Sequence, residues 1–484
     1  MNTLQPQLVW KHFQTLCAIP RPSKHEDAIR RHIELWAKER SLFTAIDLAG
    51  NLLIRKAASD GKEQVPGVAM QAHLDMVCQA MNPGAGATAH DFMKDPIQTD
   101  QEEGWLLARN TTLGADNGIG VALALAALED ETLAHGPLEV LLTVDEEAGM
   151  GGAHGLQAGW LQSRLMLNLD TEEWGEFYLG CAGGCDVHVA RSVSREDLPA
   201  GFQSMVIAIG GLRGGHSGCD IHLGRGNANR LLARVLRELD HELGGCLRLG
   251  GLRGGTARNA LPREATALIA IPLTQRTRLD DFLVHLQTAL RAELAGIDDG
   301  LSLTCRVGDA GSVIVRPDQD ALLTALAKSP YGVRAMSPDF AGVVDSSNNL
   351  GIIDLDGTHF SANLMVRSLR DAGTQSLAAE IEQVWVEQQC EVTIDGDYPG
   401  WTPNPASKLL SLCQRVYQEQ FGTNSRIQVI HAGLECGIIG AKYPGLDTVS
   451  FGPTIRGAHA PGERVEIASV ERTWQLLRAI LAAV

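Results

Sequence analysis

Short runs of apolar residues with little polar alternation occur in the first 170 residues of the chain. They cover residues 52–55, 68–72, 138–144 and 165–169. Such runs are typical of strands that helices cover on both faces. Between the second and third runs, residues 118–129 are rich in alanine and leucine and predict a helix. A strand, a helix and another strand in this order are typical of a parallel sheet.

Amphipathic patterns predict a helix near each end of the chain. The first is expected to begin at about Lys24, because Ser23 and Glu26 have the spacing of a capping box. The apolar side chains that recur on one face of this helix are Ile29, Ile33 and Trp36. The last helix carries Val470, Trp474, Leu477 and Leu481 on one face.

The pattern changes after about residue 187. Strands at 204–209 and 266–272 alternate with helices at 227–239 and 279–294. An approximate repeat follows, with strands at 301–306, between 352 and 366 and at 391–394, and helices at 320–327 and 376–387. Each half predicts a small α+β sandwich, for which the ferredoxin-like type is a candidate.

The chain is expected to form two domains. Residues 396–405 are dense in proline and glycine and predict a return crossing between domains. A helix at 407–421 and a strand at 447–451 follow this crossing. The predicted fold is an α/β domain with a mostly parallel sheet flanked by helices, formed by residues 1–186 and 398–484, with residues 187–397 inserted between its two parts.

Composition and charge narrow the classes of function. The chain has 484 residues, of which 44% are hydrophobic and 20% charged, which is ordinary for a globular protein. With 41 basic and 58 acidic residues, the net charge of -17 opposes binding to nucleic acid or anionic membranes and favours binding of multivalent cations. The longest apolar stretch, residues 119–128, is too short to span a membrane. The start of the chain lacks the pattern of a signal peptide, so a cytoplasmic location is expected.

The cysteines do not predict a disulfide framework. Ten are present, and only Cys181 and Cys185 lie close together in the sequence. Two thiols with this spacing make at most half a zinc site, so reduced structural thiols are expected.

Polar residues with metal-binding side chains follow the predicted strands directly. They are His73 and Asp75, Glu146 and Glu147, Asp170, and His459 in the loop after the strand at 447–451. The carboxyl ends of parallel strands share one edge of a sheet, where loops form the ligand crevice. Asp116 completes the set at the start of the alanine-rich helix, where a carboxylate can also act as a helix cap.

This combination predicts a site for one or two divalent metal ions. It contains two histidines and at least three carboxylates but no cysteine, a set that suits Zn²⁺ or Mn²⁺. Without cations, so many carboxylates would repel one another. Two ions would need a bridging ligand, and Asp116 is our candidate for it.

Adjacent glutamates at a strand end can have different roles, one as a metal ligand and the other as a base, because their side chains point in different directions. We assign Glu147 as a ligand and Glu146 as the general base toward a water activated by the metals. Asp75 is placed to orient the imidazole of His73 through its second nitrogen.

Several motifs together resemble those of the M20 metallopeptidases. They are His73-Leu-Asp75, Gly114-Ala-Asp116-Asn-Gly-Ile-Gly, Glu146-Glu147-Ala-Gly-Met-Gly, Asn168-Leu-Asp170 and His431-Ala-Gly-Leu-Glu-Cys-Gly. The resemblance extends over almost the whole chain. It implies a di-zinc site, with Mn²⁺ or Co²⁺ as alternatives, and a cis peptide bond after Asp116.

The resemblance also implies how the ligands are divided. One metal would be held by His73, Asp116 and Asp170, and the other by Asp116, Glu147 and His459, with Glu146 as the base. In the family, an aspartate at the position of Asp170 accompanies dipeptidase or aminopeptidase activity and supports a dipeptidase over the deacylase relatives. The resemblance as a whole implies hydrolysis of unblocked dipeptides, Xaa-His substrates among them.

The inserted domain resembles the lid of the same family. The resemblance implies that His216, in Gly-Gly-His-Ser-Gly, donates to the developing oxyanion, although its glycine neighbours also suit a plain turn. It further implies that Asn259 and Arg367 bind the free carboxylate of the dipeptide, for which the planar guanidinium of arginine is well suited. Glu435 is left as either a structural residue or a substrate contact.

Two other functions stay open at this point. One is an M20-type amidohydrolase that removes acyl groups from N-acylated amino acids, and the other is a non-catalytic peptide- or metal-binding protein. The intact Glu146 argues against the second. Dimers are common in the family, so a homodimer and a monomer are both open.

Overall fold

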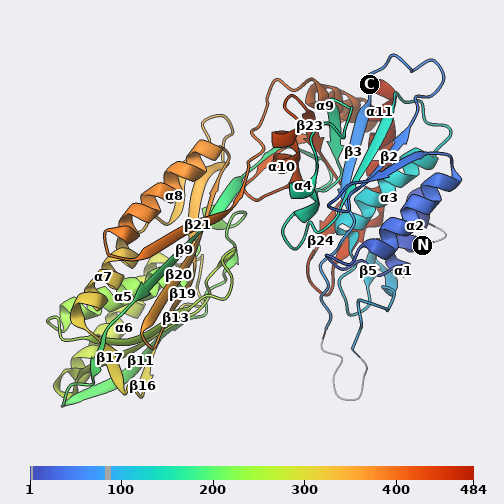
Figure 1. Cartoon of the computed structure of the whole chain (residues 1–484). Helices are drawn as coiled ribbons and strands as arrows, with labels where there is room; N and C mark the ends of the chain where they lie inside the picture. The colour runs from blue at the N-terminus through green and yellow to red at the C-terminus, as the bar shows by residue number, and fades with distance from the viewer. Residues whose placement is uncertain (2–3, 82–88) are drawn as a thin grey trace. The chain divides into compact units, whose positions relative to one another are not determined.

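The structure is a computed structural model that describes residues 1, 4–81 and 89–484. The chain forms two compact units (Figure 1). Unit 1 comprises Met1–Gly180, Trp401–Val429 and Leu434–Val484, and unit 2 comprises Cys181–Gly400 and Ile430–Gly433.

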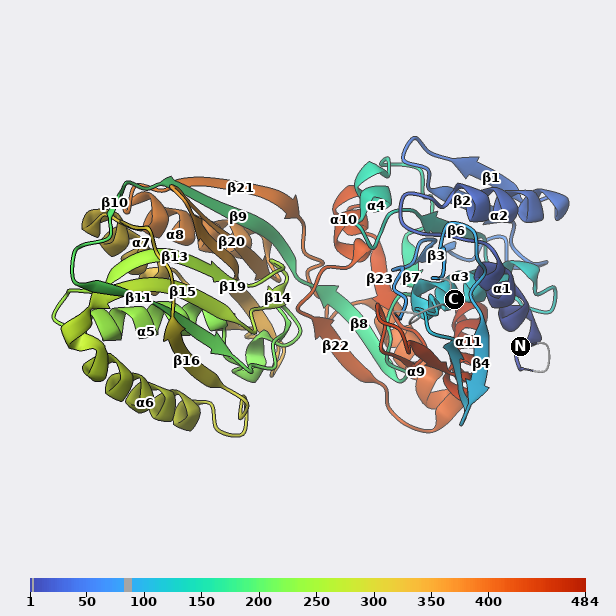
Figure 2. The ribbon, with the colours of Figure 1, turned by 90° about the horizontal axis from the view of Figure 1, so that it is seen from below.

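Unit 1 contains an eight-stranded sheet in the order β1-β2-β6-β3-β7-β23-β8-β22. The bounds are β1 Phe43–Ile46, β2 Leu52–Lys56, β6 Leu138–Thr143, β3 Val68–His73, β7 Leu165–Asn168, β23 Asp447–Ser450, β8 Glu176–Cys181 and β22 Arg426–Ile430, of which Cys181 and Ile430 belong to unit 2. The four central strands β6, β3, β7 and β23 are parallel to one another (Figure 2), whereas β2 and β8 on either side of them are antiparallel to β6 and β23. The carboxyl ends of the four parallel strands therefore share one edge of the sheet.

The helices of unit 1 explain why its central strands are so apolar. They are α1 Gln7–Ala18, α2 Asp27–Glu39, α3 Ala115–Glu129, α4 Gly151–Gly155, α9 Lys408–Phe421, α10 Glu435–Lys442 and α11 Ile467–Ala483. Helix α3 packs against β3 and β6, α1 packs against α3, and α9 packs against β23. Every residue of β3 and β6 is buried, as expected for strands covered on both faces.

The start of the second helix differs from the sequence prediction. Helix α2 begins at Asp27, and its N-cap residue is Glu26 instead of Ser23. The Ser23 hydroxyl donates a hydrogen bond to Asp75 Oδ2 over 2.7 Å. The carboxylate of Glu26 accepts from the backbone amides of Lys24 and Asp145. The predicted capping box is therefore wrong, because both side chains bind the loops at the sheet edge.

Unit 2 contains one antiparallel sheet that both predicted halves share. Its order is β16-β11-β15-β13-β19-β20-β9-β21, with β18 paired to β19. The bounds are β16 Ser302–Val307, β11 Phe202–Gly210, β15 Ala265–Pro272, β13 Arg248–Gly254, β19 Val344–Asp356, β20 His359–Ser368, β9 Gly183–Ser192, β21 Glu391–Tyr398 and β18 Gly332–Met336.

Four helices cover one face of this sheet (Figure 1). They are α5 Ala228–Glu242, α6 Arg276–Glu293, α7 Arg316–Lys328 and α8 Asp371–Val386. Alternate strand residues such as Val187, Ile207 and Leu364 join these helices in a single hydrophobic core. The residues between them along the strands, among them His188, Asn363 and Arg367, do not belong to this core and lie on the other face.

Short strands complete the two units. In unit 1, β24 Ile455–Arg456, β25 Arg464–Glu466, β5 Trp105–Ala108 and β4 Thr99–Glu102 form a small sheet. In unit 2, β12 Gly215–His216 pairs with β14 Ala260–Leu261, and β10 Arg195–Asp197 pairs with β17 Ser312–Ile314. Among the described residues, no helix has the length and apolar character needed to cross a membrane.

Candidate active site

The five predicted metal ligands come together at the carboxyl edge of the parallel strands in unit 1. His73 is the last residue of β3, Glu147 follows β6, Asp170 follows β7, and His459 lies in a loop beyond β23. Asp116 lies in the first turn of α3. Their ligand atoms form two groups within 4.8 Å, namely His73, Asp116 and Asp170, and Asp116, Glu147 and His459.

Asp116 joins these two groups through its two carboxylate oxygens. Its Oδ1 lies 3.1 Å from His73 Nε2, and its Oδ2 lies 3.0 Å from His459 Nε2. His73 Nε2 also lies 3.4 Å from Asp170 Oδ1, and His459 Nε2 lies 3.2 Å from Glu147 Oε1. Imidazole nitrogens that face several carboxylates around one shared carboxylate are a suitable donor set for two divalent ions. The residues present therefore fit such a centre.

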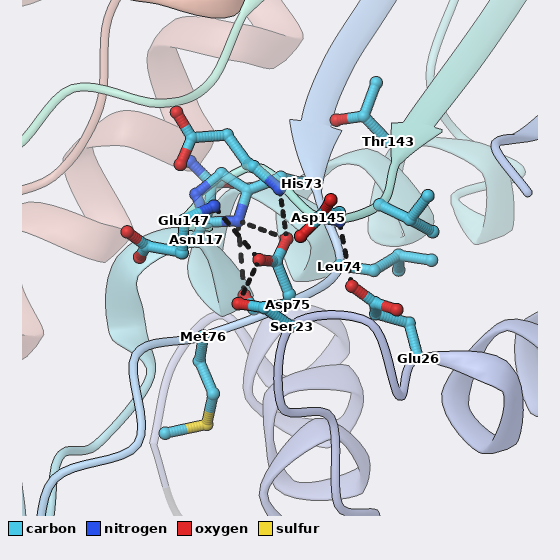
Figure 3. A network of polar contacts seen from close by, with 12 residues as sticks. Ser23, Glu26, His73, Leu74, Asp75, Met76, Asn117, Thr143, Asp145 and Glu147 are labelled. Carbon is cyan, nitrogen blue, oxygen red and sulfur yellow. Dashed lines mark hydrogen bonds and ion pairs between the residues drawn. The ribbon is translucent and has the colours of Figure 1, made fainter. Parts of the chain in front are cut away.

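Asp75 connects the loops that carry these side chains (Figure 3). Its oxygens accept hydrogen bonds from the backbone amides of Glu146 and Glu147, over 3.0 and 3.1 Å. Its Oδ1 lies 3.4 Å from His73 Nδ1, and Ser23 donates to its Oδ2. Burial would raise the pKa of Asp75, but His73, Ser23 and the amide of Glu146 outweigh it and lower the pKa well below its usual range. A carboxylate here can fix the imidazole and the two glutamates together.

The first turn of α3 is tied to the loop after β7. The peptide bond between Asp116 and Asn117 is cis, as the family resemblance implied. The side-chain amide of Asn117 donates to the backbone oxygen of Leu169 over 3.0 Å and to Asp170 Oδ1. Asn117 thus holds Asp170 beside Asp116.

Glu146 lies with His73 and Glu147 in a third group of converging ligand atoms. Burial raises its pKa well above the ordinary value, opposed by the charge of His73 and reinforced by the carboxylates of Asp170, Glu435 and Glu147. Neighbouring carboxylates also raise the pKa of His459, because they stabilise its protonated form. Its hydrogen bonds to Asp116 and Glu147 raise its pKa to about 11.

Two further acidic side chains border the site. The sequence analysis did not consider Glu172, and it left Glu435 as either a structural residue or a substrate contact. Burial, reinforced by Asp116, raises the pKa of Glu172 to about 8. Burial also raises the pKa of Glu435 to about 7. Its Oε2 accepts from Gln71 Nε2 and Thr143 Oγ1, both over 2.6 Å. The spacing Asp170-Thr-Glu172 was a signal that could have identified the first of these.

In unit 2, His216 lies at the end of β12 in a defined tautomer. Its Nδ1 accepts hydrogen bonds from the backbone amides of Gly218 and Cys219, over 3.1 and 3.0 Å. An imidazole whose Nδ1 accepts carries its proton on Nε2 when it is neutral. This is the form that can donate to an oxyanion.

Asn259 and Arg367 both contact Ser217, the residue that follows β12. Asn259 directly precedes β14, and its backbone oxygen accepts from the amide of Ser217 over 2.9 Å. The guanidinium of Arg367 is 4% exposed and donates to the Tyr398 hydroxyl over 2.7 Å. Among the described residues Arg367 makes no ion pair. Its charge is therefore available to an anionic group.

The donor set fits a divalent metal centre at the edge of a mixed α/β fold. The family model described as "Peptidase family M20/M25/M40" matches residues 69–483. The chain therefore belongs to this peptidase family. The predicted family, the predicted mixed α/β fold and the prediction of a peptide-bond hydrolase are thus confirmed.

Two relatives that are more than 40% identical match nearly the whole chain. The cytosol non-specific dipeptidase of Escherichia coli (strain K12) is 44% identical over 482 residues, which cover 99% of this chain and 98% of that protein. The crystal structure of an aminoacylhistidine dipeptidase from Vibrio alginolyticus is 42% identical, with a TM-score of 0.89 over 100% of this chain and 98% of that one. The aminopeptidase PepT from Bacillus cereus ATCC 10987 shares the fold at 15% identity, with a TM-score of 0.56 over 99% of both chains.

Proposed function

We propose that this protein is a cytoplasmic, zinc-dependent dipeptidase that hydrolyses unblocked dipeptides, including Xaa-His substrates such as β-alanyl-histidine. The observation that carries the proposal is the convergence of five ligand side chains, four of them around the shared Asp116. The names of the two full-length relatives support the substrate class and, in one case, the cytosolic location. They do not favour the alternative of an N-acyl amidohydrolase.

We assign the ligands as two sets that share Asp116. His73, Asp116 and Asp170 would hold one ion, and Asp116, Glu147 and His459 the other. When bound, the two ions would polarise the scissile carbonyl and activate a water molecule. Asp75 would orient His73 through the contact with its second ring nitrogen.

Glu146 is the proposed general base. Its carboxylate takes a proton from the attacking water and passes it to the nitrogen of the leaving amine as the C–N bond breaks. The fixed loop supports this role, because Asp75 holds the backbone amides of Glu146 and Glu147 together. Glu147 can then remain a ligand while its neighbour moves a proton.

The proposed roles in unit 2 concern the substrate. His216, with its proton on Nε2, would donate to the carbonyl oxygen as negative charge develops there. Arg367 and Asn259 would bind the carboxylate at the carboxyl end of the dipeptide. We propose that residues 187–397 act as a lid, as in the family that the motifs resemble.

Substitution of Arg367 by methionine is expected to raise KM for dipeptides more than it lowers kcat. A charge-assisted hydrogen bond contributes about 1.5–3 kcal/mol, so the loss in kcat/KM should be about 10- to 100-fold. Steady-state kinetics on alanyl-histidine measures it, and the C-terminally amidated dipeptide is the matched control because it lacks the carboxylate. An equal loss on both substrates would remove Arg367 from carboxylate recognition.

A side-by-side assay tests the proposed substrate class. Alanyl-histidine and N-acetyl-histidine place the same leaving group behind a free or a blocked amino end, and the zinc-loaded enzyme should hydrolyse only the first at an appreciable rate. The E146A variant, purified in parallel, controls for contaminating peptidases. Preferential hydrolysis of the acetylated compound would replace the proposal by the amidohydrolase alternative.

A further inference from the structure

Glu463 is a buried carboxylate that contacts the loop before Asp116 from a distant part of the chain. It lies four residues after His459 and is 2% exposed. Its Oε2 accepts from the backbone amides of Leu113 and Gly114, over 2.8 and 2.9 Å. Its Oε1 accepts from the amides of Ala115 and Asp116, over 2.7 and 3.3 Å.

These four amides lie before and within the kinked start of helix α3, where the backbone of Asp116 and Asn117 is not helical. Such donors lack a partner within the helix. The N-cap residue, Gly114, provides no side-chain cap. Glu463 therefore provides the acceptor for these amides from another loop. One of the four bonds goes to Asp116 itself, so the carboxylate fixes the backbone of the residue that the two proposed metal sites share.

Arg21 makes a complementary set of contacts from the other side of the same loop. Its guanidinium is 2% exposed, and Nη1 donates to the backbone oxygens of Leu74 and Asp75, over 2.9 and 3.0 Å. Its Nη2 donates to the backbone oxygen of Gly114. Arg21 thus connects the loop after His73 to the loop before Asp116.

Gly114 provides the space that this arrangement needs. Its backbone has a φ of +67°, and a Cβ atom there would collide with Arg21 Nη2 and the Met76 sulfur. A Cβ at Gly118 would lie 2.7 Å from the same guanidinium nitrogen. The glycines of the motif around Asp116 therefore admit a buried arginine.

We infer that Arg21 and Glu463 are positioning residues that hold the three ligand loops of His73, Asp116 and His459 in register for metal binding. The inference rests on the proposed function, because it assumes that these loops bind metal ions. Neither side chain is among the groups whose atoms converge as ligands. Their effect is transmitted through the backbone that carries the ligands, as for other groups that orient metal ligands.

The test is the affinity of the metal-free protein for Co²⁺, followed by the visible absorption of the bound ion. In E463Q, the amide nitrogen of glutamine faces backbone donors, so hydrogen bonds to the Asp116 loop are lost while the side-chain size is kept. The apparent dissociation constant should rise about 10- to 100-fold, and R21K should shift it in the same direction. Circular dichroism establishes that each metal-free variant is folded, and R21K carries the test if E463Q does not fold.

Glu139 offers a matched control at the other end of β6. It is 3% exposed, and its Oε2 accepts from the backbone amides of Gln162 and Ser163, over 2.9 and 2.7 Å. E139Q should lower the thermal unfolding temperature without weakening Co²⁺ binding. Wild-type affinity in both E463Q and R21K, or an equal loss in E139Q, would overturn the inference. A wild-type protein that binds no Co²⁺ would instead contradict the proposed metal centre.

Discussion

Replacement of Glu146 by alanine is expected to lower kcat for dipeptide hydrolysis by about 10²- to 10⁴-fold, the contribution of a positioned general base. The carboxylate lies beside His73 and Glu147 but is not needed in either proposed ligand set. Metal content, measured by elemental analysis, should therefore stay near that of the wild type. This combination separates a lost base from a lost ligand.

Asp145 provides the control for this substitution. It precedes Glu146 in the same loop and adopts a positive φ of 56°, which asparagine tolerates well. D145N should therefore retain both activity and metal content. An E146A enzyme with nearly full activity, or one that loses its metal ions, would contradict the assignment of Glu146 as the base.

Replacement of Asp116 by alanine is expected to abolish binding of both metal ions and, with it, detectable hydrolysis. The two oxygens of this carboxylate face His73 and His459 separately, so its loss removes the ligand that both proposed sets share. Equilibrium dialysis against Zn²⁺ followed by elemental analysis measures the stoichiometry. D170A is the comparison, because its carboxylate belongs to only one of the proposed ligand sets and its loss should affect one ion more than the other.

The metal stoichiometry of the D116A variant can contradict the proposal that Asp116 is shared by two ions. A D116A protein that binds both ions with wild-type affinity would show that Asp116 is not shared. If D116A and D170A lost the same single ion, Asp116 would belong to one site alone. Thermal unfolding of both variants without metal would show whether each is folded before binding is compared.

The convergence of the candidate ligands could be predicted from the sequence because it follows from the topology. The buried runs at 68–72, 138–144 and 165–169 form adjacent parallel strands, and parallel strands bring the residues that follow them to one edge. His73 and Asp170 needed only this rule. Their roles as ligands stay predictions until metal binding is measured.

Helix α1 also has a pattern in the sequence from which it could have been predicted. Helix α1 buries Val9, Trp10, Phe13, Leu16 and Cys17, which have a helical spacing in the sequence. Ser23 and Glu26 instead gave a misleading signal, because the spacing of a capping box does not exclude tertiary partners. Their hydrogen bonds to Asp75 and to the amide of Asp145 determine where α2 begins.

Arg21 and Glu463 could not have been found from a pattern of residue types. Their partners are backbone groups about 50 and 350 positions away in the sequence, and a backbone group looks the same at every position. Only the fold shows that a lone arginine and a lone glutamate meet at Gly114.

The metal dependence of hydrolysis is tested most directly by following metal content and alanyl-histidine hydrolysis in one preparation through chelation and metal return. We expect hydrolysis to be lost as the ions are removed and to be restored when about two equivalents of a divalent ion such as Zn²⁺ are bound again. Full hydrolysis by protein shown to be free of metal would contradict this expectation.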